Sequence, residues 1–374
     1  MDSKVKVAIV HDWYVASGGA EKVVKQIIDL YPHADLFSVV DFFNEEQRSE
    51  YLQGKRVTTT FIQKLPFAKS KYRNYLSLMP FAIEQLDLTS YDLVISSSHA
   101  VAKGVITGPD QTHICYCHSP IRYAWDLKFQ YLKETGLDSG LKAWIAKKML
   151  YKIRQWDLST VNGVDYFIAN SNFIKSRVWK AYRREAEVIY PNVEVEDFDL
   201  VKTKKDYYFT ASRMVPYKKL DLIVKAFSKM PDKKLIVIGD GPDMAKIMKV
   251  KTNNIEILGY QTFDVLKEHL QNAKAFVFAA EEDFGIIPVE AQACGTPVIC
   301  YGKGGLLETV ENNKTGIHFD QQTELSIIDA VTRFESNYDT FDGEYIRNHS
   351  SKFSTEVFKQ KFKRFVDDKM KARV

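Results

Sequence analysis

The sequence has no long apolar run, few cysteines and little net charge, and each shortage excludes a class of protein. No stretch approaches the ~18 apolar residues of a membrane-spanning helix. The chain starts MDSKVKVAIVHDWY and enters a strand almost at once, which leaves no room for the apolar stretch and cleavage site of a signal peptide. We therefore expect a cytoplasmic protein, with peripheral attachment to the inner face of the plasma membrane left open.

The small net charge and the four cysteines also limit the possible ligands. A formal charge of +4 over 374 residues gives no indication of nucleic-acid binding, which requires clustered basic residues. The cysteines are expected to be reduced, apolar core residues. His113, Cys115, Cys117 and His118 lie near one another, but alternate strand residues point to opposite faces and no second ligand pair has a usual zinc spacing. We expect no metal site.

Short apolar runs alternate with helical stretches in two successive sets. This alternation predicts an α/β protein with mostly parallel sheets covered on both faces. Ligands of such sheets bind beyond the carboxyl ends of the strands, so we expect two Rossmann-like, doubly wound domains facing across a cleft. The predicted strands are 5–10, 35–40, 57–62, 92–97, 112–117, 164–169 and 186–190 in the first set, and 207–212, 234–239, 254–258, 275–280, 297–301 and 316–319 in the second.

The polar stretch PNVEVEDFDLVKTKKD, which begins at Pro191, has neither a helical nor a strand period and predicts a linker. We expect a first domain over 1–192, the linker over 193–205 and a second domain over 206–352. The tail has an apolar face at helical spacing. It predicts a helix over 353–374 that packs back toward the first domain.

The densest chemistry lies in residues 274–310, KAFVFAAEEDFGIIPVEAQACGTPVICYGKGGLLETV. It predicts a strand, an acidic loop with Glu282, a helix opened by Gly285 and Pro288, and a second strand. Glu290 lies in the first turn of that helix. The free N–H groups of the helix start can bind phosphates, and the two carboxylates can bind sugar hydroxyls. Two solvated acids are the alternative interpretation.

Other candidate residues follow predicted strands. Arg213 and Lys218 lie at a helix start, where positive charge is unfavourable unless an anion is bound. His118 lies where a strand ends, and a neutral imidazole there can hydrogen-bond a substrate hydroxyl or phosphate. Gly18 and Gly19 let the backbone approach a ligand at a helix start, or serve only as a turn.

Two segments are both basic and apolar: Lys64–Arg73 and Leu141–Trp156. In the second, apolar residues recur at helical spacing while lysines and Arg154 fill other positions. Such a helix can lie on an anionic membrane, or pack on the core with one solvated face. Both interpretations stay open.

The chain resembles the family 4 retaining glycosyltransferases of the GT-B fold almost end to end. EEDFGIIPVE is similar to the family motif of two glutamates separated by seven residues, RMVPYK to its Arg, four residues, Lys pair, and GDGP to its second-domain turn. PNVEVEDF looks like the interdomain segment, with Val193 where the family usually has glycine. The loop CYCHSPIRYAWD looks most like that of bacterial O-antigen and exopolysaccharide enzymes, many of them mannosyltransferases.

The resemblance implies a role for each candidate residue. Arg213 and Lys218 would neutralise the diphosphate, Glu282 would bind the donor sugar, and His118 would hydrogen-bond that sugar near the reacting carbon. These four are the expected catalytic residues. Gly18 and Gly19 would line the acceptor side, and Glu290 would bind the ribose. The expected donor-binding residues are Gly241, Tyr260, Phe284, Gly285, Ile286, Ile287 and Glu290.

The resemblance also implies a function. We expect transfer of a hexose, with mannose favoured, from GDP-mannose or UDP-glucose to a saccharide or polyprenyl-linked saccharide in cell-surface polysaccharide or lipopolysaccharide synthesis. We expect neither a metal nor another cofactor to be required. The alternatives are a UDP-glucose-dependent glucosyltransferase of the same family, a nucleotide-sugar epimerase of the same fold, and a non-catalytic sugar-nucleotide sensor.

Overall fold

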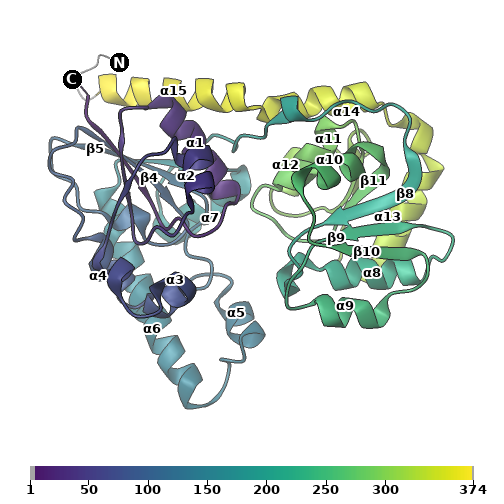
Figure 1. Cartoon of the computed structure of the whole chain (residues 1–374), viewed down its shortest axis with the longest axis horizontal. Helices are drawn as coiled ribbons and strands as arrows, with labels where there is room; N and C mark the ends of the chain where they lie inside the picture. The colour runs from purple at the N-terminus through teal and green to yellow at the C-terminus, as the bar shows by residue number, and fades with distance from the viewer. Residues whose placement is uncertain (1–4, 373–374) are drawn as a thin grey trace. The chain divides into compact units, whose positions relative to one another are not determined.

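The computed structural model describes residues 5–372, which divide into two compact units. The first unit comprises the chain up to Asn192 and again from Phe358 onward, and the second comprises Val193–Val357. Figure 1 labels their helices and strands.

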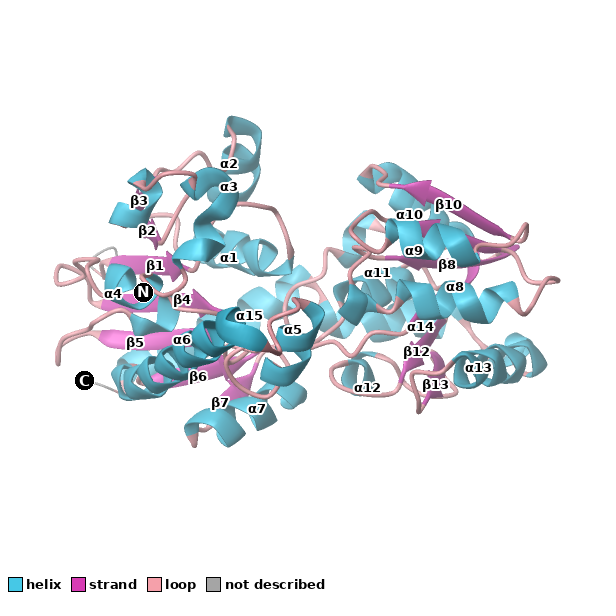
Figure 2. Cartoon of the chain, turned by 90° about the horizontal axis from the view of Figure 1, so that it is seen from below, coloured by secondary structure: helices cyan, strands magenta, loops and turns pink. Residues whose placement is uncertain are grey.

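The described part of the first unit contains a parallel sheet of seven strands in the order β3-β2-β1-β4-β5-β6-β7 (Figure 2). The strands are β1 Val7–His11, β2 Asp35–Ser38, β3 Val57–Thr59, β4 Leu93–Ser98, β5 Thr112–Cys117, β6 Tyr166–Ala169 and β7 Ala186–Val188. The helices are α1 Gly19–Leu30, α2 Glu45–Leu52, α3 Ala68–Lys71, α4 Met79–Ile83, α5 Lys128–Glu134, α6 Gly140–Ser159, α7 Asn172–Tyr182 and α15 Thr355–Lys371, which starts in the second unit.

The central strands are apolar on both faces because helices cover both faces of the sheet. Every residue of β1 is buried. Val7 and Ile9 belong to a core that also contains residues of α1 and α15, whereas Ala8 and Val10 belong to the core on the opposite face. Phe358 and Phe362 of α15 lie in the first of these cores, so this helix completes the first unit.

The described part of the second unit contains a parallel sheet of six strands in the order β10-β9-β8-β11-β12-β13. The strands are β8 Lys205–Ala211, β9 Leu235–Ile238, β10 Ile255–Gly259, β11 Ala273–Phe278, β12 Val298–Tyr301 and β13 Gly316–Phe319. The helices are α8 Leu220–Ser228, α9 Met244–Val250, α10 Phe263–Asn272, α11 Ile286–Ala293, α12 Leu306–Thr309, α13 Glu324–Ser336 and α14 Gly343–Ser350.

The predicted strands and the predicted α/β class with two parallel, doubly wound sheets are confirmed, and β5 has the predicted bounds. The segment 193–205, expected as a linker, instead belongs to the second unit. Val193, Val195 and Phe198 are buried, and the N–H of Val193 donates to the carbonyl of Phe353 at 2.8 Å. These apolar residues have no regular period, so the sequence did not reveal that the segment packs.

Candidate functional site

In both sheets the strand order reverses at one point, and the loops after the two central strands flank it. In the second unit this point lies between β8 and β11. Ligands of open parallel sheets bind beyond the carboxyl ends of the strands at such a reversal. Arg213 and Lys218 follow β8, while Glu282 and Gly285 follow β11. The structure therefore brings these four predicted residues to one edge of one sheet.

Lys218 forms an ion pair with Glu282 across this edge. Their side chains are only 20% and 15% exposed. Arg213 is exposed, and among residues 5–372 its side chain has no ion pair or hydrogen bond. Lys218 is already paired, whereas a guanidinium with free donors is suited to bind phosphate oxygens.

The start of α11 adds backbone donors to the same edge. Gly285 precedes the helix with a φ of 91°, a conformation that glycine adopts without strain. A Cβ at this position would lie 3.2 Å from a methyl group of Leu306. Ile286 and Ile287 form the first turn, where N–H groups have no acceptor within the helix. Phe284 is buried, and its ring lies 5.4 Å from that of Phe353, which anchors the loop.

Two glycines that the sequence interpretation did not single out shape this loop. The N–H of Gly305 donates to the carbonyl of Glu282 at 2.8 Å. A Cβ at Gly304 would lie 2.4 Å from that carbonyl oxygen, and one at Gly305 would lie 2.5 Å from the carbonyl oxygen of Asp283. The run GKGG after β12 was the available signal. Only glycine permits this close backbone approach beneath Glu282.

Gly241 supports the loop that carries Arg213. Its φ is 151°, and a Cβ would lie 2.5 Å from the carbonyl oxygen of Met214. The N–H of Met214 donates to the carbonyl of Asp240 at 2.8 Å, which ties the loops after β8 and β9 together. This packing accounts for the glycine, and contact with a donor stays a prediction.

Glu290 and Tyr260 differ sharply in their surroundings. Glu290 lies in α11 beyond the first turn in which the sequence had placed it, and it is 4% exposed. Tyr260 follows β10, an edge strand that β9 separates from β8, and it is 83% exposed. The structure therefore places Glu290 in the helix beside the strand reversal, whereas Tyr260 follows a strand two positions away from β8.

In the first unit the strand order reverses between β1 and β4, and Gly18 and Gly19 follow β1 at the start of α1. Gly18 is extended, with a φ of −159°, so its conformation does not require glycine. A Cβ there would approach the Oε2 atom of Glu21 at 3.1 Å. The contact with Glu21 is the one that a side chain at Gly18 would meet, and an acceptor-side role for Gly18 and Gly19 stays a prediction.

His118 directly follows β5 and is partly buried. Its Nε2 atom lies 2.8 Å from Oγ of Ser97 at the end of β4. Burial, with added repulsion from His99 and His11, holds the pKa of His118 well below its usual value. The ring is therefore neutral near pH 7, as a hydrogen-bonding imidazole requires.

Asp12 and His99, which the sequence interpretation missed, form a second polar pair beside His118. Asp12 is completely buried and accepts hydrogen bonds from the N–H groups of residues 99–102 at 2.6–3.0 Å. Nδ1 of His99 lies 2.9 Å from Oδ2 of Asp12. Burial alone would raise the pKa of Asp12, but His99 and these donors hold it below its usual value. Asp12 thereby fixes the loop after β4.

The cysteines and His113 serve the core. His113 is buried, with Nε2 2.8 Å from Oγ of Ser96 and Nδ1 2.9 Å from the carbonyl oxygen of Gly163. Cys115 and Cys117 are buried and free. Within residues 5–372 no group of three or more His, Cys, Asp or Glu side chains is placed to hold a metal ion.

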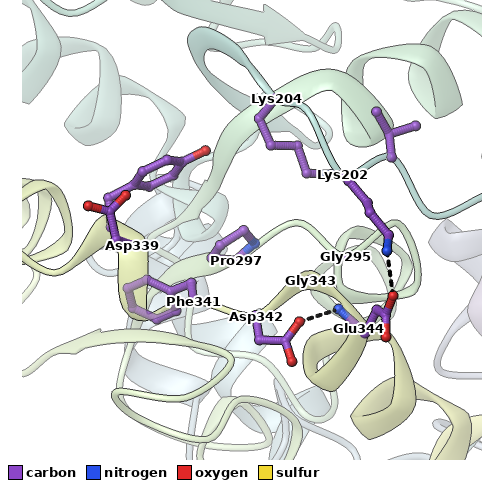
Figure 3. Close-up of a pocket in the computed structure, with 11 residues that line it drawn as sticks. Lys202, Lys204, Gly295, Pro297, Asp339, Phe341, Asp342, Gly343 and Glu344 are labelled. Carbon is purple, nitrogen blue, oxygen red and sulfur yellow. Dashed lines mark hydrogen bonds and ion pairs between the residues drawn. The ribbon is translucent and has the colours of Figure 1, made fainter.

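A hollow of about 340 Å³ lies elsewhere in the second unit (Figure 3). Lys202 and Glu344 pair across it at 2.6 Å. Lys204, also in its wall, donates to Gln271, Cys294 and Thr296, and burial lowers its pKa to about 8. None of the predicted site residues lines this hollow, so it adds nothing to the site after β8 and β11.

The two basic segments expose apolar side chains. Phe67 is 75% exposed in the segment 64–73. The second segment forms α6, where Leu150 and Ile153 are buried in its second half. Its first half instead exposes Leu141, Trp144 and Ile145, at 76%, 59% and 55%. The second half of α6 thus fits a helix packed on the core, and the first half fits a helix that lies on an anionic membrane. Across residues 5–372 the structure contains no helix that is both long and apolar enough to cross a membrane.

Two family profiles match almost the whole chain between them. The profile described as Glycosyltransferase Family 4 matches residues 17–197, and that described as Glycosyl transferases group 1 matches residues 193–351. The two matches correspond closely to the two structural units.

Curated relatives include mannosyltransferases. The chain is 23% identical over 442 residues to Alpha-1,3/1,6-mannosyltransferase ALG2 of Kluyveromyces lactis, covering 97% of this chain and 84% of the relative. It is 27% identical over 201 residues to a GDP-mannose-dependent alpha-(1-6)-phosphatidylinositol monomannoside mannosyltransferase of Mycobacterium tuberculosis, covering 46% and 52%. It is 28% identical over 226 residues to the Uncharacterized glycosyltransferase MJ1178 of Methanocaldococcus jannaschii, covering 58% and 63%. The last two matches span between half and two thirds of each relative.

Solved structures share the fold. Anabaena Alr3699/HepE in complex with UDP-glucose superposes with a TM-score of 0.69 at 16% identity, over 97% of this chain and 99% of that chain. Sucrose-phosphate synthase from Thermosynechococcus elongatus superposes with a TM-score of 0.73 at 15% identity, over 99% and 100%. At such identities the likeness establishes the architecture alone.

Proposed function

The chain belongs to the family 4 glycosyltransferases of the GT-B fold, and we propose that it transfers a hexose from a nucleoside diphosphate sugar to a saccharide acceptor with retention of configuration. One observation carries the proposal. Arg213, Lys218 and the N-terminus of α11 follow the two strands that flank the strand reversal of the second unit, where Lys218 pairs with Glu282 and α11 carries Glu290. Cations and backbone donors suit a diphosphate, and carboxylates suit hydroxyl groups.

The proposed chemistry follows from charge. Breaking the bond between sugar and phosphate develops negative charge on the leaving diphosphate, and donors already aimed there stabilise the transition state. Arg213 and Lys218 supply that stabilisation, with the N–H groups of Ile286 and Ile287. Glu282 and Glu290 bind hydroxyl groups of the donor rather than exchanging protons. The reaction then needs no metal ion.

We favour mannose as the transferred sugar, with GDP-mannose as donor and UDP-glucose next. The names of two curated relatives support mannose, and the UDP-glucose bound in Alr3699/HepE supports the second choice. Calorimetry with a panel of nucleotide sugars, followed by donor hydrolysis, tests the proposal. If the protein binds none of these nucleotide sugars, the proposal is contradicted. If chelation abolishes activity, the proposed independence from metal ions is contradicted. Epimerised nucleotide sugar formed without acceptor would indicate an epimerase, and binding without turnover a sensor.

Glu290→Gln is expected to raise the KM for the donor about 10- to 100-fold while kcat changes little. The reason is that ribose hydroxyls far from the reacting carbon are bound equally in the ground and transition states. Initial rates over a range of donor concentration measure both constants. Glu344→Gln, in an exposed pair with Lys202, is the matched control. A fall in kcat at unchanged KM would refute ribose binding by Glu290.

We propose that the acceptor is a polyprenyl-linked saccharide on an anionic membrane. We also propose that the first half of α6 contacts that membrane. Exposed Trp144 and Ile145 lie there beside exposed Lys142 and Lys148. Apolar side chains that enter the interface and lysines near anionic headgroups act together in such helices.

Lys142→Glu and Lys148→Glu are each expected to weaken binding to phosphatidylglycerol vesicles at low salt at least fivefold, because each lysine contributes ~1 kcal/mol near such a surface. Vesicle sedimentation measures the binding, and added salt should weaken it in the wild type. Leu325→Ala, an exposed apolar residue of α13, is the control. Unchanged binding by both lysine variants would remove α6 from the contact.

A further inference from the structure

One face of the first sheet ends in three polar side chains on adjacent strands. Within β1 and β4, His11 is paired in register with Ser97, and Ser97 is paired with Tyr116 of β5. His118 follows two residues after Tyr116, and their rings lie 5.1 Å apart. The rows below them are apolar and belong to one core, so His11 and Ser97 lie at the carboxyl ends of their strands and His118 lies just beyond the end of β5.

The distances among these groups favour one arrangement of their protons. Nδ1 of His11 is 3.1 Å from the carbonyl oxygen of Ser97 and 3.1 Å from its Oγ. A carbonyl oxygen can only accept, so Nδ1 of His11 carries the hydrogen and donates. Ser97 Oγ also accepts from this N–H, and its own hydrogen is then available to a second partner. That partner is Nε2 of His118, at 2.8 Å.

We infer that Ser97 is a positioning residue that holds His118 as the Nδ1–H tautomer, so that its ring offers substrate a hydrogen-bond donor. The tautomer of a histidine is set by the bond that its other nitrogen makes, and here Nε2 is occupied by the hydroxyl of Ser97. Within residues 5–372 no hydrogen bond involves Nδ1 of His118. The burial that holds the pKa of His118 low keeps the ring neutral, as a single tautomer requires.

This inference deepens the proposed function, because it rests on His118 contacting a substrate oxygen. As the Nδ1–H tautomer, His118 donates to a sugar hydroxyl or phosphate oxygen and does not remove a proton through that atom. Its role is then to orient the sugar or to stabilise developing negative charge.

Nitrogen NMR of the full chain with ¹⁵N-labelled histidine tests the tautomer without substrate. The chain has 8 histidines, and His118→Gln identifies the signals of His118 by their loss. We expect the wild type to show a protonated Nδ1 and an unprotonated Nε2. Ser97→Ala should shift the ring toward the Nε2–H form that water favours, and Ser97→Thr should retain the wild-type pattern. A protonated Nε2 in the wild type, or no change in Ser97→Ala, would overturn the inference.

Ser96→Ala is the matched control on the same strand. Ser96 bonds Nε2 of His113, whose Nδ1 is independently fixed by the carbonyl oxygen of Gly163. Its loss should leave the tautomers of His113 and His118 unchanged. If His118 changes equally in Ser96→Ala, a general loosening of β4 accounts for the effect and the inference fails.

Kinetics then separate the tautomer from the reaction. Ser97→Ala should lower kcat about tenfold with little change in the KM for the donor, and Ser97→Thr should restore it. If no nucleotide sugar is turned over, the proposed function fails while the NMR result stands. If turnover occurs but Ser97→Ala matches the wild type in kcat, the positioning role fails alone.

Discussion

Replacing either Arg213 or Lys218 with alanine is expected to lower kcat/KM for sugar transfer about 100- to 1,000-fold, the loss found when one preorganised donor to a developing anion is removed. Both residues follow β8, next to the start of α11. Negative charge grows on the leaving diphosphate as the sugar bond breaks, so each cation contributes more in the transition state than in the ground state. Steady-state kinetics with the preferred donor, together with calorimetry using the nucleoside diphosphate, measure the effect.

The two variants should differ in stability, which makes the test sharper. Arg213 has no ion pair among the described residues, so Arg213→Ala should unfold like the wild type. Lys218→Ala leaves the sheltered carboxylate of Glu282 without its partner and should be less stable. Lys218→Ala combined with Glu282→Gln should recover part of that stability without recovering activity.

Lys229→Ala is the control for both variants. Lys229 pairs with Glu324 at 2.6 Å and its side chain is 57% exposed, so its removal takes away one positive charge of the second unit at the surface. Its kinetics should match the wild type. Equal losses in all three variants would indicate a general field effect, and wild-type rates in Arg213→Ala and Lys218→Ala would refute the assigned roles.

The fold could be predicted because both sheets are parallel and buried on both faces. Their strands read as continuous short apolar runs, which the sequence displays without any tertiary information. The errors lie at strand ends. The predicted strand 57–62 ends as β3 at Thr59, because the hydroxyl of Thr60 accepts from the N–H of Ile62 and starts a turn.

The site was only partly predictable, because some of its residues are recognisable only from strand order. Arg213 and Glu282 stood out as charges directly after predicted strands. Asp12, Ser97 and His99 are ordinary polar residues in the sequence, and their meaning depends on β1 and β4 being neighbours. No local period encodes that adjacency, so a buried carboxylate and a solvated one looked alike.

Asp12→Asn is expected to lower the free energy of unfolding of the first unit by about 3–5 kcal/mol, the usual loss when one partner of a buried charged network is removed. The carboxylate accepts from the N–H groups of residues 99–102 with both oxygens. An amide has one oxygen and turns its NH₂ group toward two of those donors. Native-state hydrogen exchange should therefore show lost protection at residues 99–102. Asp87→Asn is the control, because this exposed carboxylate accepts hydrogen bonds from Thr89. It should change neither the free energy of unfolding nor the protection of residues 99–102.

The pH dependence gives this prediction its strictest test. The pKa of Asp12 is lowered from 3.8, so its contribution is present above that value and is lost as pH falls toward the folded-state pKa. Burial opposes the charge on His99, but Asp12 outweighs it and raises the pKa of His99 above 6.5. The contribution of His99 is therefore present below pH 6.5 and is lost as pH rises through the folded-state value. The stability difference between wild type and Asp12→Asn should be largest between about pH 4 and 6.5. A difference that is constant from pH 3 to 9 would show that Asp12 acts through shape and not through its charge.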